Sequence, residues 1–591
     1  MTREELISRL NGYEWTDFEC KKAQRSVPKD AYVTVSAFAN TEGGWLLFGV
    51  SDEQGQLKVT GVDHDAFDHI QNDFLSTLRS GQKINHILDV EPYVYDLDGK
   101  RILAFYIPQS PRRQKPVYLK GNPRETYIRR AAGDERVTDA ELQRFLRDAA
   151  VTSWDTEPLQ NVEVATCIDS ETLGWYQSQF YRRNPEQRQI SDPVEFLREW
   201  NFIVDEGGRP LLTRAAVLLF GTDRCVRALL PRPVLDYQRI DARVQEWTPE
   251  ERWHDRLVFE ENLFKTWREL VAKFSRLAEH PFRVDPSSMR RNDDPPDYIA
   301  FREAAINLLI HQDYGDVHRK ASLKIFIDQI TFWNPGDAFA TQRELLESTE
   351  KEIRNPLLVN AFRRIGLSDQ AGTGIRAIYR NWHDLGHRPP QIINDKAAKS
   401  FELTLSKEPL ITDSIRRFHS SLGVNLSAEQ ADILALAAER SHISVVDAGV
   451  AVGGNLRVAH SALDFLVRQQ LLQTLSEDSY SLADPIKGRL ESVERDRLSV
   501  GQDGEGWDQV GTRSGPSRDQ VEIMRNSLEA ITISELMQLV GRTNRTKFRD
   551  QVLKPLLEAG WLEMTISDKP TSSKQRYRLT EAGRDILVRM Q

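Results

Sequence analysis

The sequence predicts an α/β protein built from several domains. At 591 residues, the chain is too long to fold around one hydrophobic core. Strand-like and helix-like patterns alternate in residues 1–150 and again in residues 236–405. Beyond residue 411 the pattern becomes helical, with two units that each combine three helices with a short hairpin. A hydrophobic content of 40% with 28% charged residues is typical of soluble globular proteins.

The first 150 residues contain a clear alternation. We expect a carboxylate-bearing strand at 15–21, a helix at 29–40 and a buried strand, WLLFGV, at 45–50. The stretch YVYDLDGKRILAFYIP predicts a hairpin, because Asp98 and Gly99 favour a tight turn.

The middle of the chain alternates again, and the C-terminal part is helical. The clearest middle elements are a helix at 298–312 and a strand, SLKIFIDQITFWN, at 322–334. A Gly-, Ser- and Asp-rich stretch separates the two helical units and predicts a flexible linker. The predicted domain ranges are 1–150, a connecting domain at 151–235, 236–410, a first helical unit at 411–485, the linker at 486–517, and 518–591.

Composition excludes several classes of protein. No apolar run approaches the roughly 20 residues that a membrane helix needs, and no targeting signal is readable, so we expect a cytoplasmic protein without membrane contact. Cys20, Cys167 and Cys225 are too far apart for a local zinc clamp. The net charge of −9 argues against wholesale polyanion coating, although residues 112–136 and 541–580 are each rich in Lys and Arg.

A pair of carboxylates opens the first candidate site. In EWTDFECKK, Glu14 and Glu19 are an odd number of residues apart, so a regular strand would point them to opposite faces. A bulge or turn at Thr16 and Asp17 would bring them together. Carboxylate oxygens suit hard divalent cations, whereas the alternative is a pair that only supports the fold or lies in solvent.

This stretch, followed by SAFANTEGGWLLFGVSDEQG and PVYLKGNPRETYIRRAAGDERVTDAEL, resembles the AlbA-type nucleic-acid-binding domain of bacterial proteins and the Schlafen family. The resemblance covers residues 10–147. It implies a Schlafen/AlbA-like α+β domain in which Glu14, Glu19 and Asp52 bind Mg²⁺ or Mn²⁺ and cut nucleic acid. Lys21 would bind the phosphate or orient the nucleophile. Non-cutting relatives of this domain leave an inherited framework as the alternative.

A basic stretch within this domain is the candidate RNA or DNA surface. Its cations interleave with Tyr118 and Tyr127, a composition suited to phosphate contact and base stacking, with a solvated edge as the alternative. The candidate cations are Arg112, Arg113, Lys115, Lys120, Arg129 and Arg130.

A polar row marks the second candidate site. Glu303, Asn307 and His311 are spaced by four residues and share one helix face, with Asp313 just beyond. Downstream come the turns NPG at 334–336, RNP at 354–356 and AGTGI at 371–375.

This series resembles the divergent, RecG-like form of the GHKL-type ATP-binding domain, an α/β sandwich. The resemblance implies ATP with Mg²⁺, a water-orienting Glu303, a metal ligand in Asn307, and glycine turns that cradle the nucleotide. NPG replaces the usual aspartate-glycine turn, which puts the adenine contact in doubt, and no GxxxxGK[ST] supports a helicase motor. A degenerate dimerisation or scaffold domain is the alternative. The implied cofactor residues are Glu303, Asn307, His311, Asp313, Asn334, Gly336, Gly372, Thr373 and Gly374.

The last unit resembles the C-terminal winged helix of RecG-like and Fic-related bacterial proteins, and the earlier unit is winged-helix-like. Cations crowd the start of its second helix and its wing, where recognition elements meet a DNA groove. Protein contact is the alternative role of this unit. The candidate DNA contacts are Arg542, Asn544, Arg545, Lys547, Arg549, Lys574 and Arg576.

Two functional hypotheses follow. In the first, the protein is a nucleotide-controlled, metal-dependent nuclease of stress or phage defence, with weak ATPase activity as an option. In the second, it is an ATP-binding transcriptional regulator that binds nucleic acid without cutting it. We expect a homo-oligomer in either case.

Overall fold

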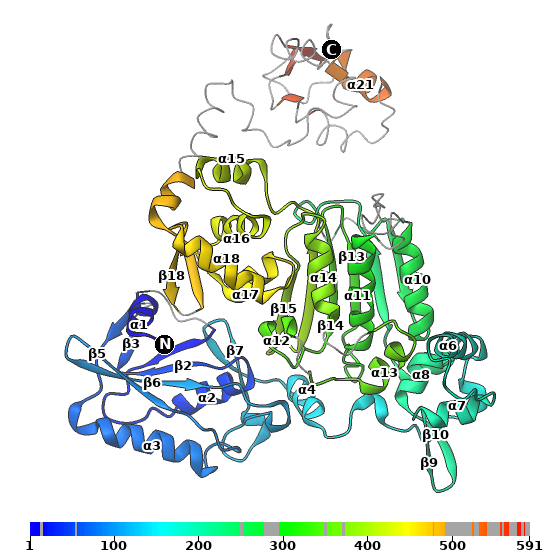
Figure 1. Ribbon diagram of the computed structural model, residues 1–591, viewed down its shortest axis with the longest axis horizontal. Helices are drawn as coiled ribbons and strands as arrows, with labels where there is room; N and C mark the ends of the chain where they lie inside the picture. The colour runs from blue at the N-terminus through cyan, green and yellow to red at the C-terminus, as the bar shows by residue number, and fades with distance from the viewer. Residues whose placement is uncertain are drawn as a thin grey trace. The chain divides into compact units, whose positions relative to one another are not determined.

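The computed structural model describes most of the chain (Figure 1). The chain divides into two compact units, Met1–Lys487 and Gly488–Gln591, which are treated separately below. The described residues are 1–11, 16–53, 56–248, 250, 252–276, 295–347, 351–368, 373–476, 478–490, 523, 524, 527, 531–539, 553, 556, 557, 561–565, 576–580 and 584.

A four-stranded mixed sheet forms the N-terminal domain. Its strand order is β1-β2-β6-β5, with β1 parallel to β2 and the other neighbours antiparallel. The predicted hairpin is confirmed, because Asp98 and Gly99 connect β5 to β6 with φ values of 55° and 77°. The strands are β1 (Phe18–Lys21), β2 (Gly44–Phe48), β5 (Pro92–Leu97) and β6 (Lys100–Ile107).

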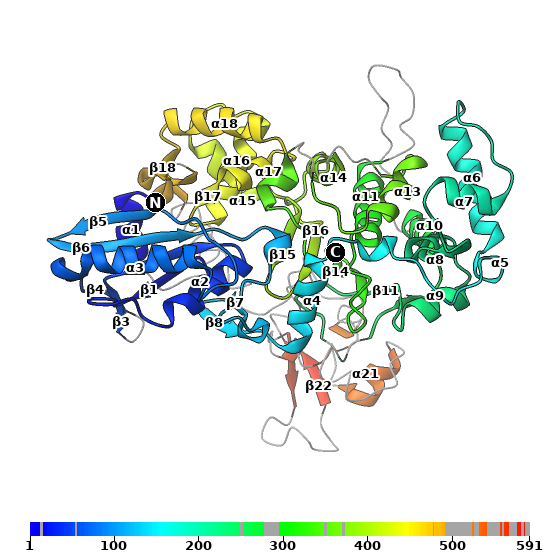
Figure 2. The ribbon, with the colours of Figure 1, turned by 90° about the horizontal axis from the view of Figure 1, so that it is seen from below.

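Helices cover both faces of this sheet. Alternate residues of a strand point to opposite faces, so Leu46 and Phe48 pack in one apolar cluster and Leu47 in another. The first cluster joins the sheet to α2 and α3, and the second joins it to α1; Figure 2 shows α3 running along the β5–β6 pair. The other elements of this domain are α1 (Arg3–Leu10), α2 (Ala31–Asn40), β3 (Val50–Glu53), β4 (Gln56–Val59), α3 (Phe67–Ser80), β7 (Tyr127–Arg130), β8 (Gly133–Arg136) and α4 (Asp139–Ala149).

A six-stranded sheet forms the middle of the chain, in the order β12-β11-β13-β14-β16-β15. Only β11 and β13 are parallel among these neighbours, and Figure 1 shows α10, α11 and α14 side by side across one face. The strands are β11 (Leu235–Arg239), β12 (Asp255–Phe259), β13 (Ala321–Ile325), β14 (Gln329–Pro335), β15 (Gln391–Asp395) and β16 (Ser400–Ser406). The helices are α10 (Leu263–Ser275), α11 (Pro296–Ile310), α12 (Gln342–Leu346), α13 (Pro356–Arg364) and α14 (Thr373–His383).

The expected single strand at 322–334 is a hairpin instead. The backbone N–H of Phe326 donates to the carbonyl oxygen of Gln329, which closes a turn between β13 and β14. Asp328 lies in this turn and accepts a hydrogen bond from the backbone N–H of Val244. The apolar run was wrongly assigned to one strand because the polar side chains of the turn are few.

The connecting segment packs into the same apolar core as the six-stranded sheet. Tyr176 lies on α6, and its hydroxyl donates to the carbonyl oxygen of Ala361 on α13. One buried cluster therefore runs from Cys167 to Leu405. The elements of this segment are α5 (Val164–Cys167), α6 (Ser170–Arg183), α7 (Pro193–Glu199), β9 (Ile203–Glu206), β10 (Arg209–Leu212), α8 (Arg214–Phe220) and α9 (Asp223–Leu229).

Helices and a small antiparallel sheet follow β16. Gly453 and Gly454 press against α14: a Cβ atom on Gly454 would lie 3.3 Å from Cβ of Tyr379. The elements are α15 (Asp413–Ser421), α16 (Ala428–Glu439), β17 (Ile443–Ser444), α17 (Val445–Ala451), α18 (Leu456–Arg468), β18 (Leu472–Ser476) and β19 (Ser479–Leu482).

The second unit is described only in part. A three-stranded sheet in the order β20-β22-β21 packs with an apolar cluster that includes Leu536 and Leu553. Within the described residues of both units, no helix is long and apolar enough to cross a membrane. The elements are β20 (Ile531–Thr532), α21 (Ile533–Leu539), β21 (Leu562–Met564) and β22 (Arg576–Leu579).

Candidate functional site

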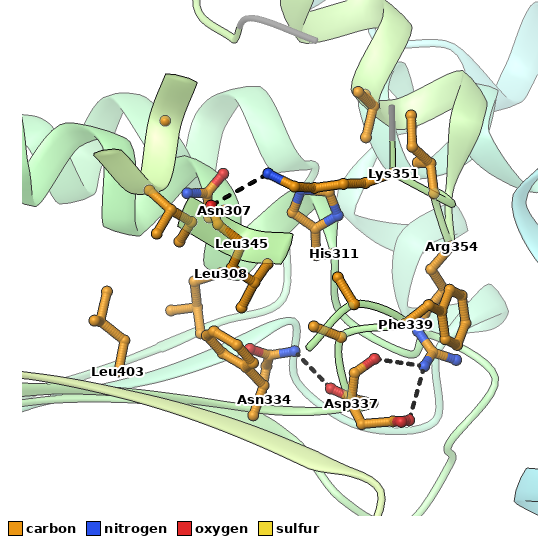
Figure 3. Close-up of a pocket in the computed structure, with 18 of the residues that line it drawn as sticks. Asn307, Leu308, His311, Asn334, Asp337, Phe339, Leu345, Lys351, Arg354 and Leu403 are labelled. Carbon is orange, nitrogen blue, oxygen red and sulfur yellow. Dashed lines mark hydrogen bonds and ion pairs between the residues drawn. The ribbon is translucent and has the colours of Figure 1, made fainter. Parts of the chain in front are cut away.

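A pocket between α11 and the six-stranded sheet gathers much of the second predicted site (Figure 3). The polar row of α11 forms one wall, since its residues recur every four positions, while Ala300, Ala305 and Leu309 of the same helix pack in the core. The predicted residues that line it are Glu303, Asn307, His311, Asn334, Gly336 and Gly374.

Glu303 and Asn307 face the start of α14. A Cβ atom on Gly374 would lie 3.4 Å from Oε2 of Glu303 and 3.9 Å from Oδ1 of Asn307. A carboxylate and an amide oxygen therefore meet the N-terminal end of an 11-residue helix, where backbone N–H groups favour anions.

The donors at this place fit Mg²⁺, which prefers oxygen ligands and is commonly held by few protein groups plus phosphate oxygens. Within the described part of the chain, no set of three or more acidic, His or Cys side chains is arranged to hold a metal ion on its own. Asn307 and Glu303 are the side chains at this place that could contribute oxygen atoms to a metal ion shared with phosphate.

The NPG turn forms the opposite wall. Asn334 is buried, and its amide donates to the carbonyl oxygen of Pro335 at 3.2 Å. Gly336 has a φ of +97°, and a Cβ atom there would lie 3.0 Å from Nε of Arg354. Glycine is required at this position because both the backbone conformation and the neighbouring guanidinium exclude a side chain.

Charged side chains that the sequence had not singled out surround the same turn. Asp337 follows it and lies 3.4 Å from Arg354 and from Lys399, and 3.6 Å from Lys396. Lys351 lines the pocket beside His311, and its ammonium donates to the carbonyl oxygen of Leu345 (Figure 3).

His311 stays neutral at physiological pH. The protein surrounds the ring, although its side chain is exposed to the pocket. Burial, with Arg354 and Lys351 nearby, lowers the pKa of His311 to about 4. The imidazole therefore offers one donor and one acceptor to a ligand.

The remaining predicted cofactor residues are Asp313, Gly372 and Thr373. Asp313 points away from the pocket and pairs with Arg147 of α4 at 2.8 Å. Gly372 and the side chain of Thr373 lie outside the described residues.

The first predicted site holds a buried ion-pair cluster. Phe18 and Cys20 pack with α1, so Glu19 and Lys21 point to the opposite face of β1. The carboxylate of Glu19 lies 2.6 Å from Nζ of Lys21 and 2.8 Å from Nη2 of Arg129. Glu19 is only 6% exposed, so its charge is balanced inside the domain.

The structure describes two further parts of that site. Asp52 lies exposed on β3, and Thr16 and Asp17 form a turn ahead of β1, where the sequence predicts one. Glu14 lies outside the described residues.

The N-terminal candidate cations divide into interior and surface groups. Lys115 is buried, and its ammonium donates to the carbonyl oxygen of Asn40 at 2.8 Å. Arg129 is buried between Glu19 and Asp134. For Lys115 and Arg129, the predicted phosphate contact must be corrected to an internal role, because neither reaches the surface.

The remaining cations of this stretch are at least partly accessible. Arg113 and Lys120 are exposed, whereas Arg130 is paired with Glu135 and Glu141. Arg112 is mostly buried and lies 3.3 Å from a carboxylate oxygen of Glu352.

One of the predicted DNA contacts of the last unit lies within the described residues. Arg576 is exposed on β22. The others, which lie outside the described residues, are Arg542, Asn544, Arg545, Lys547, Arg549 and Lys574.

For two of the charged residues around the NPG turn, the sequence contained a usable signal, namely a neighbouring turn motif. Arg354 belongs to the RNP turn, and Asp337 directly follows the NPG turn. Lys396 and Lys399 lie between two strands without any local pattern.

Four family models match parts of the chain. The model named "Schlafen, AlbA_2" matches residues 14–138. The model named "Putative ATP-dependent DNA helicase recG C-terminal" matches residues 318–405. A domain of unknown function matches 143–236, and the C-terminal domain of Fic-like proteins, named for filamentation induced by cAMP, matches 519–580. A search of the curated proteins found no match.

Solved structures include three similar chains. A protein from Corynebacterium diphtheriae is 19% identical, with 95% of this chain and 94% of that chain covered and a TM-score of 0.37. The N-terminal domain of a RecG-related protein from Nitrosomonas europaea is 31% identical, with 23% and 95% covered and a TM-score of 0.19. A Fic family protein from Desulfovibrio desulfuricans is 20% identical, with 41% and 72% covered and a TM-score of 0.11.

The matched families support a nucleic-acid-binding, ATP-related protein. The chain contains a Schlafen/AlbA_2 domain over residues 14–138 and a RecG-like ATPase domain over residues 318–405.

Proposed function

We propose that the pocket on α11 binds ATP or ADP with Mg²⁺, and that the nucleotide controls nucleic-acid binding by the rest of the chain. The observation that carries this proposal is the convergence of Glu303 and Asn307 on Gly374. In that arrangement, Asn307 would supply a metal ligand, and the metal would neutralise phosphate charge.

The other side chains of the pocket have matching roles. Phosphates at the N-terminal end of α14 would meet the backbone N–H groups of its first turn, and Lys351 lines the same pocket. Phe332 and Leu403 supply an apolar floor suited to a base. Glu303 would orient a water molecule for slow hydrolysis of the nucleotide.

For the N-terminal domain, we favour binding without cleavage, as in a transcriptional regulator. The support is the buried pairing of Glu19 with Arg129 and Lys21, because a carboxylate held by two cations is a weak metal ligand. The second candidate is a metal-dependent nuclease acting in stress or phage defence. Its support is the carboxylate of Asp52, which lies exposed on β3 and is accessible to a metal ion.

Calorimetry with ATP and MgCl₂ tests the nucleotide site. Wild type should bind with micromolar to millimolar affinity, and Asn307→Ala should lose most of that affinity because an oxygen ligand disappears. Asn72→Ala is the matched control, since Asn72 is exposed on α3 of the other domain. No heat from wild type, or the same curve for Asn307→Ala, would refute the site.

A further inference from the structure

A chain of buried charges joins the nucleotide pocket to the N-terminal domain. Arg354 lines the pocket, and its guanidinium pairs with Asp148 at the end of α4 and with Asp337 after the NPG turn. Lys399 lies 3.3 Å from the carboxylate of Asp148 and 3.4 Å from that of Asp337. Two cations thus share two carboxylates across the junction.

These charges are withdrawn from water. The Asp148 and Lys399 side chains are each 4% exposed. Although burial opposes ionisation, Arg354 and Lys399 lower the pKa of Asp148 to about 2. The four residues carry no net charge together. Because they are buried, a new anion beside Arg354 would strongly change the electrostatic energy of its pairing with the two carboxylates.

Arg354 has capacity for such an anion. Its Nε–H is buried and has no hydrogen-bond partner among the described residues. The guanidinium stacks on Phe339 at 4.4 Å, which holds it beside the pocket (Figure 3). Arg112 of the N-terminal domain also lies over the Phe339 ring, at 4.5 Å from its centroid, so this ring contacts both domains.

We propose that Arg354 is a nucleotide-phosphate ligand for which Asp148 competes. This inference rests on the proposed nucleotide site. A phosphate oxygen bound by Arg354 weakens its pairing with Asp148 and loosens the end of α4. By reciprocity, docking of α4 lowers the affinity for nucleotide by the same factor.

The remaining contacts of α4 limit the movement. Arg144 pairs with Asp316 at 3.0 Å, and Arg147 pairs with Asp313 at 2.8 Å. Neither pair includes a pocket cation, so nucleotide leaves them in place. The expected change is a repositioning of the last turn of α4, rather than separation of the domains.

The test compares nucleotide affinity in Asp148→Asn with that in Asp139→Asn. Asp139 lies on the same helix, is 78% exposed and pairs with Arg124, so its variant is the matched control. Asp148→Asn should bind ATP with MgCl₂ roughly fivefold more tightly or better, because the competing charge is gone. The control should bind as wild type does.

Hydrogen exchange of the wild type gives a second measurement that does not depend on the variant folding. ATP should reduce amide protection in the last turn of α4 and leave α3 unchanged. Nucleotide binding with unchanged or weaker affinity in a folded Asp148→Asn, or unchanged protection of α4, overturns the competition. Absence of nucleotide binding in every protein instead removes the proposed pocket itself.

Discussion

The guanidinium of Arg129 lies 2.8 Å from the carboxylate of Glu19, although the two residues belong to strands at opposite ends of the N-terminal domain's sequence. Arg129 also donates to the carbonyl oxygen of Phe18 at 3.1 Å, so it holds both the side chain and the backbone of β1. This contact makes Glu19 part of the framework that fixes β1 against β7.

The first prediction separates framework from catalysis at Glu19. Glu19→Ala should lower the thermal midpoint, because the buried Arg129 and Lys21 lose a carboxylate partner, at a cost of about 3–5 kcal/mol. Glu19→Gln should be milder, since it keeps an acceptor. Thermal melts beside Mn²⁺-dependent cleavage of RNA and DNA check this.

The control at this site is Asp52→Asn, which is exposed and should leave stability unchanged. If wild type cuts nucleic acid, and Glu19→Ala and Asp52→Asn both stop cleavage while melting as wild type does, the framework role is wrong and the nuclease is right.

The polar row of α11 was predictable because its spacing of four residues places Glu303, Asn307 and His311 on one face whatever the helix packs against. The junction was not predictable. Asp148 and Arg354 are 206 positions apart, and neither belongs to a pattern that distinguishes a buried ion pair from a solvated charge. Their pairing follows from how the two domains dock, which local sequence does not encode.

The second prediction concerns a helix cap supplied from a distant segment. The carboxylate of Asp155 accepts hydrogen bonds from the backbone N–H groups of Leu357 and Leu358 at the start of α13. Asp155→Ala should destabilise the chain by about 1–2 kcal/mol, because both buried donors lose their acceptor. Asp155→Asn keeps an acceptor oxygen and serves as the matched variant.

The pH dependence at Asp155 has a definite sign. Burial raises the pKa of Asp155 to about 7, despite the two N–H donors. The folded state therefore favours the protonated acid, and its contribution to stability is lost as the pH rises from about 4 to about 7. As the pH rises from 5 to 8, the thermal midpoint of Asp155→Asn should therefore increase relative to that of wild type. An unchanged difference across that range contradicts the burial argument.

A third prediction concerns the contact between α14 and α16. His383 lies 2.9 Å from the carboxylate of Asp432, and this hydrogen bond, opposed by burial, raises the pKa of His383. A raised pKa gives stability that is complete below the unfolded-state value of about 6.5 and is lost as the pH rises through the folded-state value. Wild type should therefore lose more thermal stability than Asp432→Asn between pH 6 and pH 8. Parallel curves for the two proteins would exclude the pair as a contributor.

A fourth prediction tests the last unit as a DNA reader. Arg545→Ala and Lys547→Ala should each weaken DNA binding and reduce the slope of log affinity against log salt by about one, as expected for one lost phosphate contact. Fluorescence anisotropy over a salt series measures both quantities. If removal of residues 521–591 leaves DNA affinity unchanged, this unit binds protein instead.

The last prediction uses His311 as a reporter of phosphate in the pocket. Burial and the cations Arg354 and Lys351 lower its pKa to about 4, so the free protein holds a neutral imidazole above that pH. Nucleotide phosphates bring negative charge into the same pocket and raise the pKa. At about pH 5, binding should therefore take up a fraction of a proton, and the uptake should fade towards pH 8 as the ring stays neutral in both states. Calorimetry in two buffers of different ionisation enthalpy measures this uptake. His311→Gln should bind nucleotide without it, whereas His69→Gln, exposed on α3, should behave as wild type does. Equal heats in both buffers at pH 5, with nucleotide bound, would show that the phosphates lie away from His311.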